Sequence, residues 1–380
     1  MLLAAFIAAQ PLYAAADCFV SKQQQYIYER GVAPAKENAQ ITACLLKRLN
    51  PDNFDEFDKA AASLRKSNNT APAISAMMRI FKETKNPRAA FSAAAFLISA
   101  PYELAAYEKQ LLNILASNTQ DYKQTLAVIV LASMESIGAN YAPFLTPAID
   151  GKDPVLQAYA AAAYTVIVPG IKDLYLDKII MLYGFDKAFA QMAFNATGLK
   201  DKVLHAALKT ALRSADETMR ISAIEWAAET NDKTLLNAIL NANYDPKDTQ
   251  TLAAAAQAMV RNMPAMRGEV KKAFKKPPTS AQATIAVMAY SFIGAEGSND
   301  IEAFLKSSNT NEVSNALRVI SYTAGILAED AAYYPNPLLE DYQIKRLIPL
   351  AAHIDDTAKN TQVKAYAATA VKELYKLLNK

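Results

Sequence analysis

Apolar positions recur along the chain with a helical period, and the helices they predict return at a nearly fixed spacing. Between about residue 86 and residue 325, an Asp or Asn repeatedly precedes a run of Ala and larger apolar residues. Such residues favour the position before a helix because their side chains accept hydrogen bonds from its first N–H groups. The runs follow Asn86, Asp121, Asp153, Asp186, Asp216, Asp248 and Asn311, with a further unit near Pro278. Their spacing of roughly 32 residues predicts stacked helical repeats.

Each repeat predicts two helices, which we call A and B in chain order. In one unit, Asp153 is the expected cap and Pro154 occupies the first helical position, where its missing N–H costs nothing. An Ala-rich A helix follows, Pro169-Gly170 makes the turn, and KDLYLDKIIMLYG predicts the B helix. The recurring Asp and Asn residues are therefore interpreted as helix caps and not as metal ligands.

These units resemble HEAT repeats in their Asp-Pro start, their Ala-rich A helix and their short B helix. Their length is similar to the shorter class found in phycobilisome-lyase-like proteins. The family's usual Arg has counterparts in Arg88 and Arg220, whereas Gln157 stands in the Asp153 unit. The resemblance covers about residues 67–327. It implies an all-α fold, namely a right-handed α-solenoid of stacked antiparallel helix pairs whose B helices line a concave surface, and it implies little about activity.

Composition agrees with this fold class and narrows the function. The chain has 380 residues, a hydrophobic fraction of 52% and only 10 Gly, which favours helices over a large sheet. The net charge of +3 gives no strong field for nucleic acid or a membrane. We expect no integral membrane span and no cofactor.

The first residues, MLLAAFIAAQPLYAAA, are apolar and end on small residues, which predicts a signal peptide cut after Ala16 and a periplasmic protein. No Lys or Arg precedes the apolar run. An apolar first helix of the fold is one alternative, and a lipoprotein anchored at Cys18 is another, although Asp17 disfavours it. The only other cysteine is Cys44. In an oxidising compartment the two predict one disulfide, the alternative being two buried free thiols.

The departures from the repeat divide the chain into segments. Residues 17–66 do not fit the repeat and are expected to cap the exposed end of the array. The repeat pattern also ends after Leu327. The expected segments are a signal peptide (1–16), an N-terminal helical cap (17–66), the HEAT-like array (67–327), a Tyr/Pro-rich insertion (328–340) and C-terminal capping helices (341–380).

Two segments are candidate binding sites. The first is a run of basic residues whose only acidic neighbour in sequence is Glu269. Such a run could bind an acidic protein or an anionic surface. The alternative is that it forms a solvated helix face without a binding role. The second is the Tyr/Pro-rich segment, because tyrosines offer contact area at low entropic cost; its alternative is a loop packed on the repeats. The candidate residues are Arg261, Arg267, Lys271, Lys272, Lys275, Lys276, Tyr333, Tyr334 and Tyr342.

Catalysis has little support in the sequence. The two histidines, His205 and His353, lie in helical segments without a neighbouring nucleophile or metal-binding pattern. We therefore expect a non-catalytic scaffold or adaptor of the cell envelope that binds an unidentified protein on its surface. Two alternatives are a lyase or hydrolase with an active site on the concave face, and a peripheral envelope protein that binds anionic surfaces through the basic run.

Overall fold

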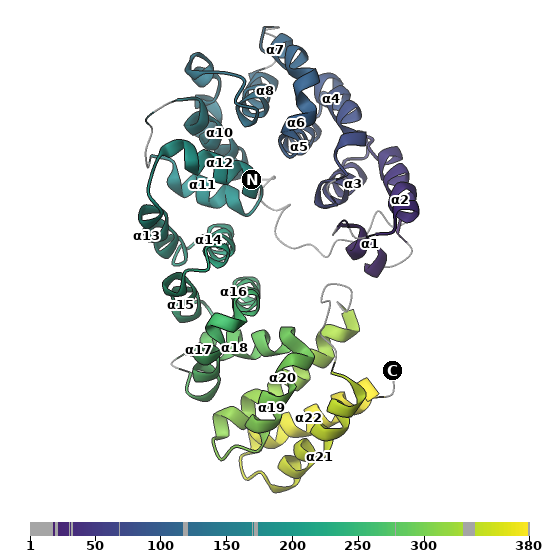
Figure 1. The fold of residues 1–380 in the computed structure, drawn as a ribbon, viewed down its shortest axis with the longest axis vertical. Helices are drawn as coiled ribbons and strands as arrows, with labels where there is room; N and C mark the ends of the chain where they lie inside the picture. The colour runs from purple at the N-terminus through teal and green to yellow at the C-terminus, as the bar shows by residue number, and fades with distance from the viewer. Residues whose placement is uncertain are drawn as a thin grey trace. The chain divides into compact units, whose positions relative to one another are not determined.

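The computed structural model describes residues 18–19, 22–29, 31, 33–67, 69–116, 121–168, 170, 174–277, 279–329 and 339–378. In these residues the fold is all-α, as the sequence predicts (Figure 1). The predicted signal peptide lies outside them, as does most of the predicted insertion. The chain divides into two compact units, Met1–Ala207 and Leu208–Lys380.

The first unit contains two rows of helices. In the A row each helix packs on the next; its members are α3 (Phe54–Lys66), α5 (Pro87–Ile98), α8 (Asp121–Ser133), α10 (Pro154–Ile167) and α12 (Lys187–Thr197). The B row alternates with it along the chain and consists of α4 (Ile74–Glu83), α7 (Glu108–Ala116), α9 (Thr146–Ile149) and α11 (Leu176–Tyr183). The remaining elements are α1 (Lys22–Glu29), α2 (Ala35–Lys47), η2 (Ala71–Ala73), α6 (Pro101–Leu104), η3 (Ala105–Tyr107), η4 (Ala139–Phe144) and α13 (Asp201–Ala211), which reaches into the second unit.

The second unit repeats this arrangement. Its A row consists of α14 (Glu217–Glu229), α16 (Thr249–Arg261), α18 (Ser280–Ile293), α20 (Thr310–Glu329) and α22 (Thr361–Leu378). Its B row consists of α15 (Lys233–Asn241), α17 (Met263–Lys275), α19 (Ser298–Leu305), preceded by η5 (Gly294–Gly297), and α21 (Asp341–Thr357).

Small side chains hold the A row together. Ala160, Ala161, Ala162 and Ala163 on α10 are fully buried, so neighbouring A helices approach closely. In the first unit the A row consequently lies on the inside of the bend (Figure 1). The expectation that B helices line the concave side is therefore wrong for this unit, because the more closely packed row is the shorter one.

The predicted caps are present at most A helices. Asp153 Oδ1 accepts hydrogen bonds from the N–H groups of Val155 and Leu156 at 3.0 and 3.1 Å. Asn86, Asp186, Asp216 and Asp248 cap their helices in the same way.

The cap predicted at Asn311 is wrong. Asn309 Oδ1 accepts from the N–H groups of Asn311 and Glu312 at 2.9 and 3.3 Å, so α20 begins two residues earlier. Both asparagines precede the apolar run at acceptable spacing, and the sequence pattern does not separate them.

The predicted disulfide joins Cys18 to Cys44, with a Cα–Cα distance of 5.6 Å. It ties the segment before α1 to α2. Gly31, two residues after α1, has a φ of 69°, a left-handed conformation that glycine adopts without steric cost. The disulfide is typical of proteins from oxidising compartments.

Replacing both cysteines by serine should lower the unfolding free energy of the first unit by about 3 kcal/mol, because the cross-link closes a loop across 26 residues. Urea unfolding followed by circular dichroism measures the change, and hydrogen exchange of α1 and α2 should accelerate most. An unchanged midpoint, with unchanged exchange in both helices, would contradict this structural role.

Candidate functional site

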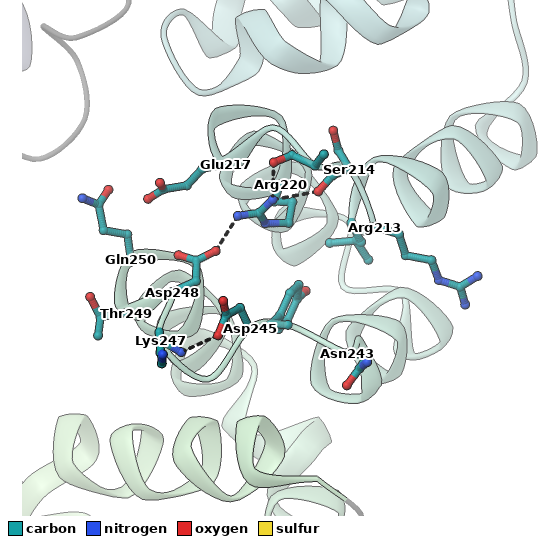
Figure 2. Close-up of a pocket in the computed structure, with 13 residues that line it drawn as sticks. Arg213, Ser214, Glu217, Arg220, Asn243, Asp245, Lys247, Asp248, Thr249 and Gln250 are labelled. Carbon is teal, nitrogen blue, oxygen red and sulfur yellow. Dashed lines mark hydrogen bonds and ion pairs between the residues drawn. The ribbon is translucent and has the colours of Figure 1, made fainter.

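The second unit contains a cavity of about 810 Å³ beside the starts of α14 and α16. Arg220 on α14 and Asp248, which caps α16, face each other within it (Figure 2). The wall carries further charges of both signs, from Arg213, Glu217, Asp245 and Lys247.

Arg220 joins two consecutive repeats. Its Nη2 donates to Asp248 Oδ2 at 2.5 Å, and its Nη1 donates to the carbonyl oxygens of Ser214 and Ala215 at 2.7 and 2.9 Å. The side chains of Arg220 and Asp248 are only 16% and 12% exposed. A largely desolvated pair of this kind is held by its additional hydrogen bonds. The guanidinium is therefore engaged within the protein and is not a free anion receptor.

The local environment sets the pKa of Asp248 below its usual value. Burial alone would raise this pKa, but hydrogen bonds from Thr251 and Arg220 to the carboxylate outweigh burial and lower it. Tyr244 also lines the cavity and is buried, and no described group forms a hydrogen bond with its hydroxyl. Burial is the main cause that raises the Tyr244 pKa.

The Arg220–Asp248 pair in this cavity therefore links two consecutive repeats. The pair is internally satisfied, and the rim of the cavity carries Arg213 and Lys247 against Glu217 and Asp245, which balances the charge. This lining selects no particular class of ligand by charge.

The predicted basic run covers the end of α16, α17 and the turn after it, but acidic residues distant in sequence lie against α17. Asp300 on α19 accepts from Arg267 at 2.7 Å and from Lys271 at 2.8 Å. Burial would raise the pKa of Asp300, but the hydrogen bonds from Lys271 and Arg267 hold it below its usual value. Tyr290 also donates to Asp300, at 3.2 Å.

Two further lysines of α17 are also paired. Lys272 lies 3.0 Å from Glu269, and Lys275 lies 3.7 Å from Glu312 on α20. The remaining two predicted residues, Arg261 and Lys276, are exposed. Exposed ion pairs contribute little to stability, but they do reduce the positive field of the surface. Sequence reasoning missed Asp300 and Glu312, because no local spacing places them beside α17.

The predicted tyrosines do not form a described cluster. Tyr333 and Tyr334 lie outside the described residues. Tyr342 is the second residue of α21 and is 55% exposed. The structure therefore shows the surroundings of only one of the three.

An exposed stripe on the A row of the second unit was not predicted. The helices α16, α18 and α20 each contact their neighbours in the row on two sides and the B row on a third, which leaves one side free. Partly exposed residues recur there at helical spacing. They include Ile221, Glu225 and Glu229 on α14, Ala254 and Gln257 on α16, Thr284 and Met288 on α18, and Arg318 and Tyr322 on α20.

A comparison of the chain with models of known protein families finds no match, and a comparison with curated proteins finds no relative. No helix in the described part of the chain has the length and apolarity needed to cross a bilayer. Among the same residues, no three His, Cys, Asp or Glu side chains are placed to hold a metal ion.

Replacing Arg220 by Met should lower the unfolding free energy by about 2–3 kcal/mol, because it leaves the buried Asp248 carboxylate without its charged donor. Arg213→Met, at the exposed rim of the same cavity, is the matched control and should change stability by less than about 0.5 kcal/mol. Urea unfolding followed by the fluorescence of Trp226, the only tryptophan, measures both. Equal changes in unfolding free energy for the two variants would contradict the stabilising role of the Arg220–Asp248 pair.

The lowered pKa values of Asp248 and Asp300 predict acid sensitivity. In the folded state the pKa of both carboxyls lies below 3.8, the ordinary value of Asp, so the unfolded chain binds more protons near that pH. Their stabilisation is present above about pH 4 and is lost as the pH falls through the folded pKa values. Unfolding midpoints measured from pH 6 to pH 3 should fall at the acid end, and less steeply in Asp248→Asn. An identical slope in that variant would contradict the assignment.

Proposed function

We propose that the chain is an exported α-solenoid of HEAT type that serves as a non-catalytic scaffold and binds a protein partner on the A-row face of its second unit. The repeated caps, the alternation of two helix rows and the inter-repeat pair of Arg220 and Asp248 support the solenoid. The disulfide and the apolar N-terminal sequence support export, with cleavage after Ala16.

The observation that carries the proposal is the exposed stripe on successive A helices. Ile221, Met288 and Tyr322 provide apolar or aromatic contacts on this stripe. The small Ala254 lies on α16, the helix between α14 and α18. Apolar and aromatic groups at the centre of a patch are typical of protein interfaces. Glutamates lie on α14 and Arg318 lies on α20. Arg318 donates to Thr284 on α18 at 3.3 Å, so it also joins two A helices of the stripe.

The other two functions receive less support. A hydrolase or lyase needs convergent titratable groups, but those of the described cavity are engaged with one another or balanced in charge. Binding to anionic surfaces needs an unpaired basic patch, but Arg267, Lys271, Lys272 and Lys275 lie beside carboxylates.

Ala254→Glu should reduce capture of the partner by about tenfold or more, because it places a charge in the middle of the proposed interface. Ala265→Glu is the matched control, since it makes the same change at an exposed position on α17 in the B row. Affinity capture from the native envelope fraction, quantified by mass spectrometry for both variants and the wild type, measures the difference.

Two results would contradict the proposed surface. Equal capture by the wild type and Ala254→Glu would exclude this face, and a selective loss with Ala265→Glu would assign binding to the B row. Circular dichroism should show that both variants keep their helix content, since Glu is nearly as good a helix former as Ala.

A further inference from the structure

The helix α8 is enclosed on every side over most of its length. Each residue from Lys123 to Ser133 is at most 7% exposed. The A helices α5 and α10 flank α8 in the row, and α7 and η4 pack against its B side. Because the side chains of a helix point in all directions around its axis, burial of the whole run means that the remaining side, which faces away from the B row, is covered as well.

The polar side chains at the start of α8 are bonded on its B side. Each donates to a backbone carbonyl oxygen of a B helix or of η4: Lys123 to Lys82 on α4 at 2.8 Å, Gln124 to Leu115 on α7 at 3.0 Å, and Thr125 to Phe144 in η4 at 2.8 Å. The next seven residues, Leu126 to Ala132, are all apolar. Apolar side chains are therefore sufficient to cover the remaining side.

Two aromatic rings from the flanking helices meet over that remaining side. The ring centroids of Phe91 on α5 and Tyr159 on α10 lie 5.7 Å apart, and the rings are nearly edge to face. Since α7 and η4 occupy the B side of α8, this contact passes over α8 on the inner side of the bend (Figure 1). Tyr159 also lies 6.2 Å from Phe189 on α12, so the ring contacts continue to the next A helix. Tyr159 and Phe189 are each only 2% exposed.

We propose that Phe91 and Tyr159 form an aromatic bridge across α8 that fixes the curvature of the first unit and couples two A helices that are not neighbours. In ordinary repeat arrays each repeat contacts only its neighbours, so the array can bend at each interface. The aromatic bridge lies on the inner side of the bend, and opening the bend would separate its two rings. The helices α5, α8 and α10 therefore open together. The aromatic bridge belongs to the first unit and is independent of the partner surface proposed on the second.

Hydrogen exchange of the full-length protein, followed by mass spectrometry, tests the aromatic bridge. Phe91→Leu keeps an apolar side chain on α5 and removes the ring that contacts Tyr159. It should accelerate amide exchange in α8 and α10 by about fivefold, the scale set by one aromatic pair. Exchange in α3, the other neighbour of α5 in the row, should change less than exchange in α10. Coupling through neighbours alone predicts the opposite order, because α3 contacts α5 directly.

The same contact can be removed from its other end. Tyr159→Leu should accelerate exchange in α5 as well as in α8 and α10. The double variant should accelerate α8 no more than Tyr159→Leu alone, because both changes break one contact.

Phe144→Leu is the matched control. Its ring contacts Tyr141 within η4, at a centroid distance of 6.4 Å, so the same substitution breaks a local ring contact. Although η4 packs against α8 and α10, this variant should leave exchange in α5 unchanged.

Three outcomes would overturn the aromatic bridge. In the first, Phe91→Leu accelerates α3 as much as α10 or more. In the second, the double variant accelerates α8 by the product of the two single effects, which indicates independent contacts. In the third, Phe144→Leu accelerates α5 as strongly as Tyr159→Leu does, which indicates a general loosening of the unit. If Tyr159→Leu does not fold, Phe91→Leu alone decides, because α10 either responds more than α3 or does not.

Discussion

The burial of each A helix between its two neighbours is the constraint on which the rest of the fold depends. An A helix packs on the preceding A helix, on the following one and on the B row, so three of its sides must be apolar. Ala meets this demand with little side-chain entropy lost, and it brings backbones close together. The fully buried run Ala160–Ala163 illustrates this packing. The same crowding leaves one side of an A helix free for other contacts, and in the second unit partly exposed side chains lie on that side.

Close packing of apolar rows does not by itself set the register of successive repeats. Buried polar side chains supply that register, since an unpaired donor or acceptor in such a place is costly. Asn262 donates to the carbonyl of Ala228 at 3.1 Å, and Asn315 donates to that of Phe274 at 2.9 Å. Lys123 likewise donates to the carbonyl of Lys82 at 2.8 Å. Each bond joins residues 34 or 41 apart in sequence, about the length of one repeat.

The helix caps and the disulfide could be predicted from the sequence, whereas ion pairs between residues far apart in sequence could not. The caps at Asp153 and Asp216 follow from residue type and position, because a cap bonds to N–H groups two or three residues away. The disulfide followed from counting two cysteines. The neutralisation of Lys271 and Lys275 depended on α19 and α20, which no local pattern places beside α17.

The sequence by itself determined an all-α chain, where most of its A helices begin, and the period at which they return. Those properties depend on interactions within a few residues and on a hydrophobic period that is visible in one dimension. Only the tertiary structure decided which row lies inside the bend of the first unit, which charges of α17 are neutralised and which side chains meet across the row. Phe91 on α5 and Tyr159 on α10 lie in ring contact at 5.7 Å although they are far apart in sequence and α8 stands between their helices in the row. Their contact depends on the curvature of the stacked row, which results from the sum of many packing distances and is encoded in no single segment.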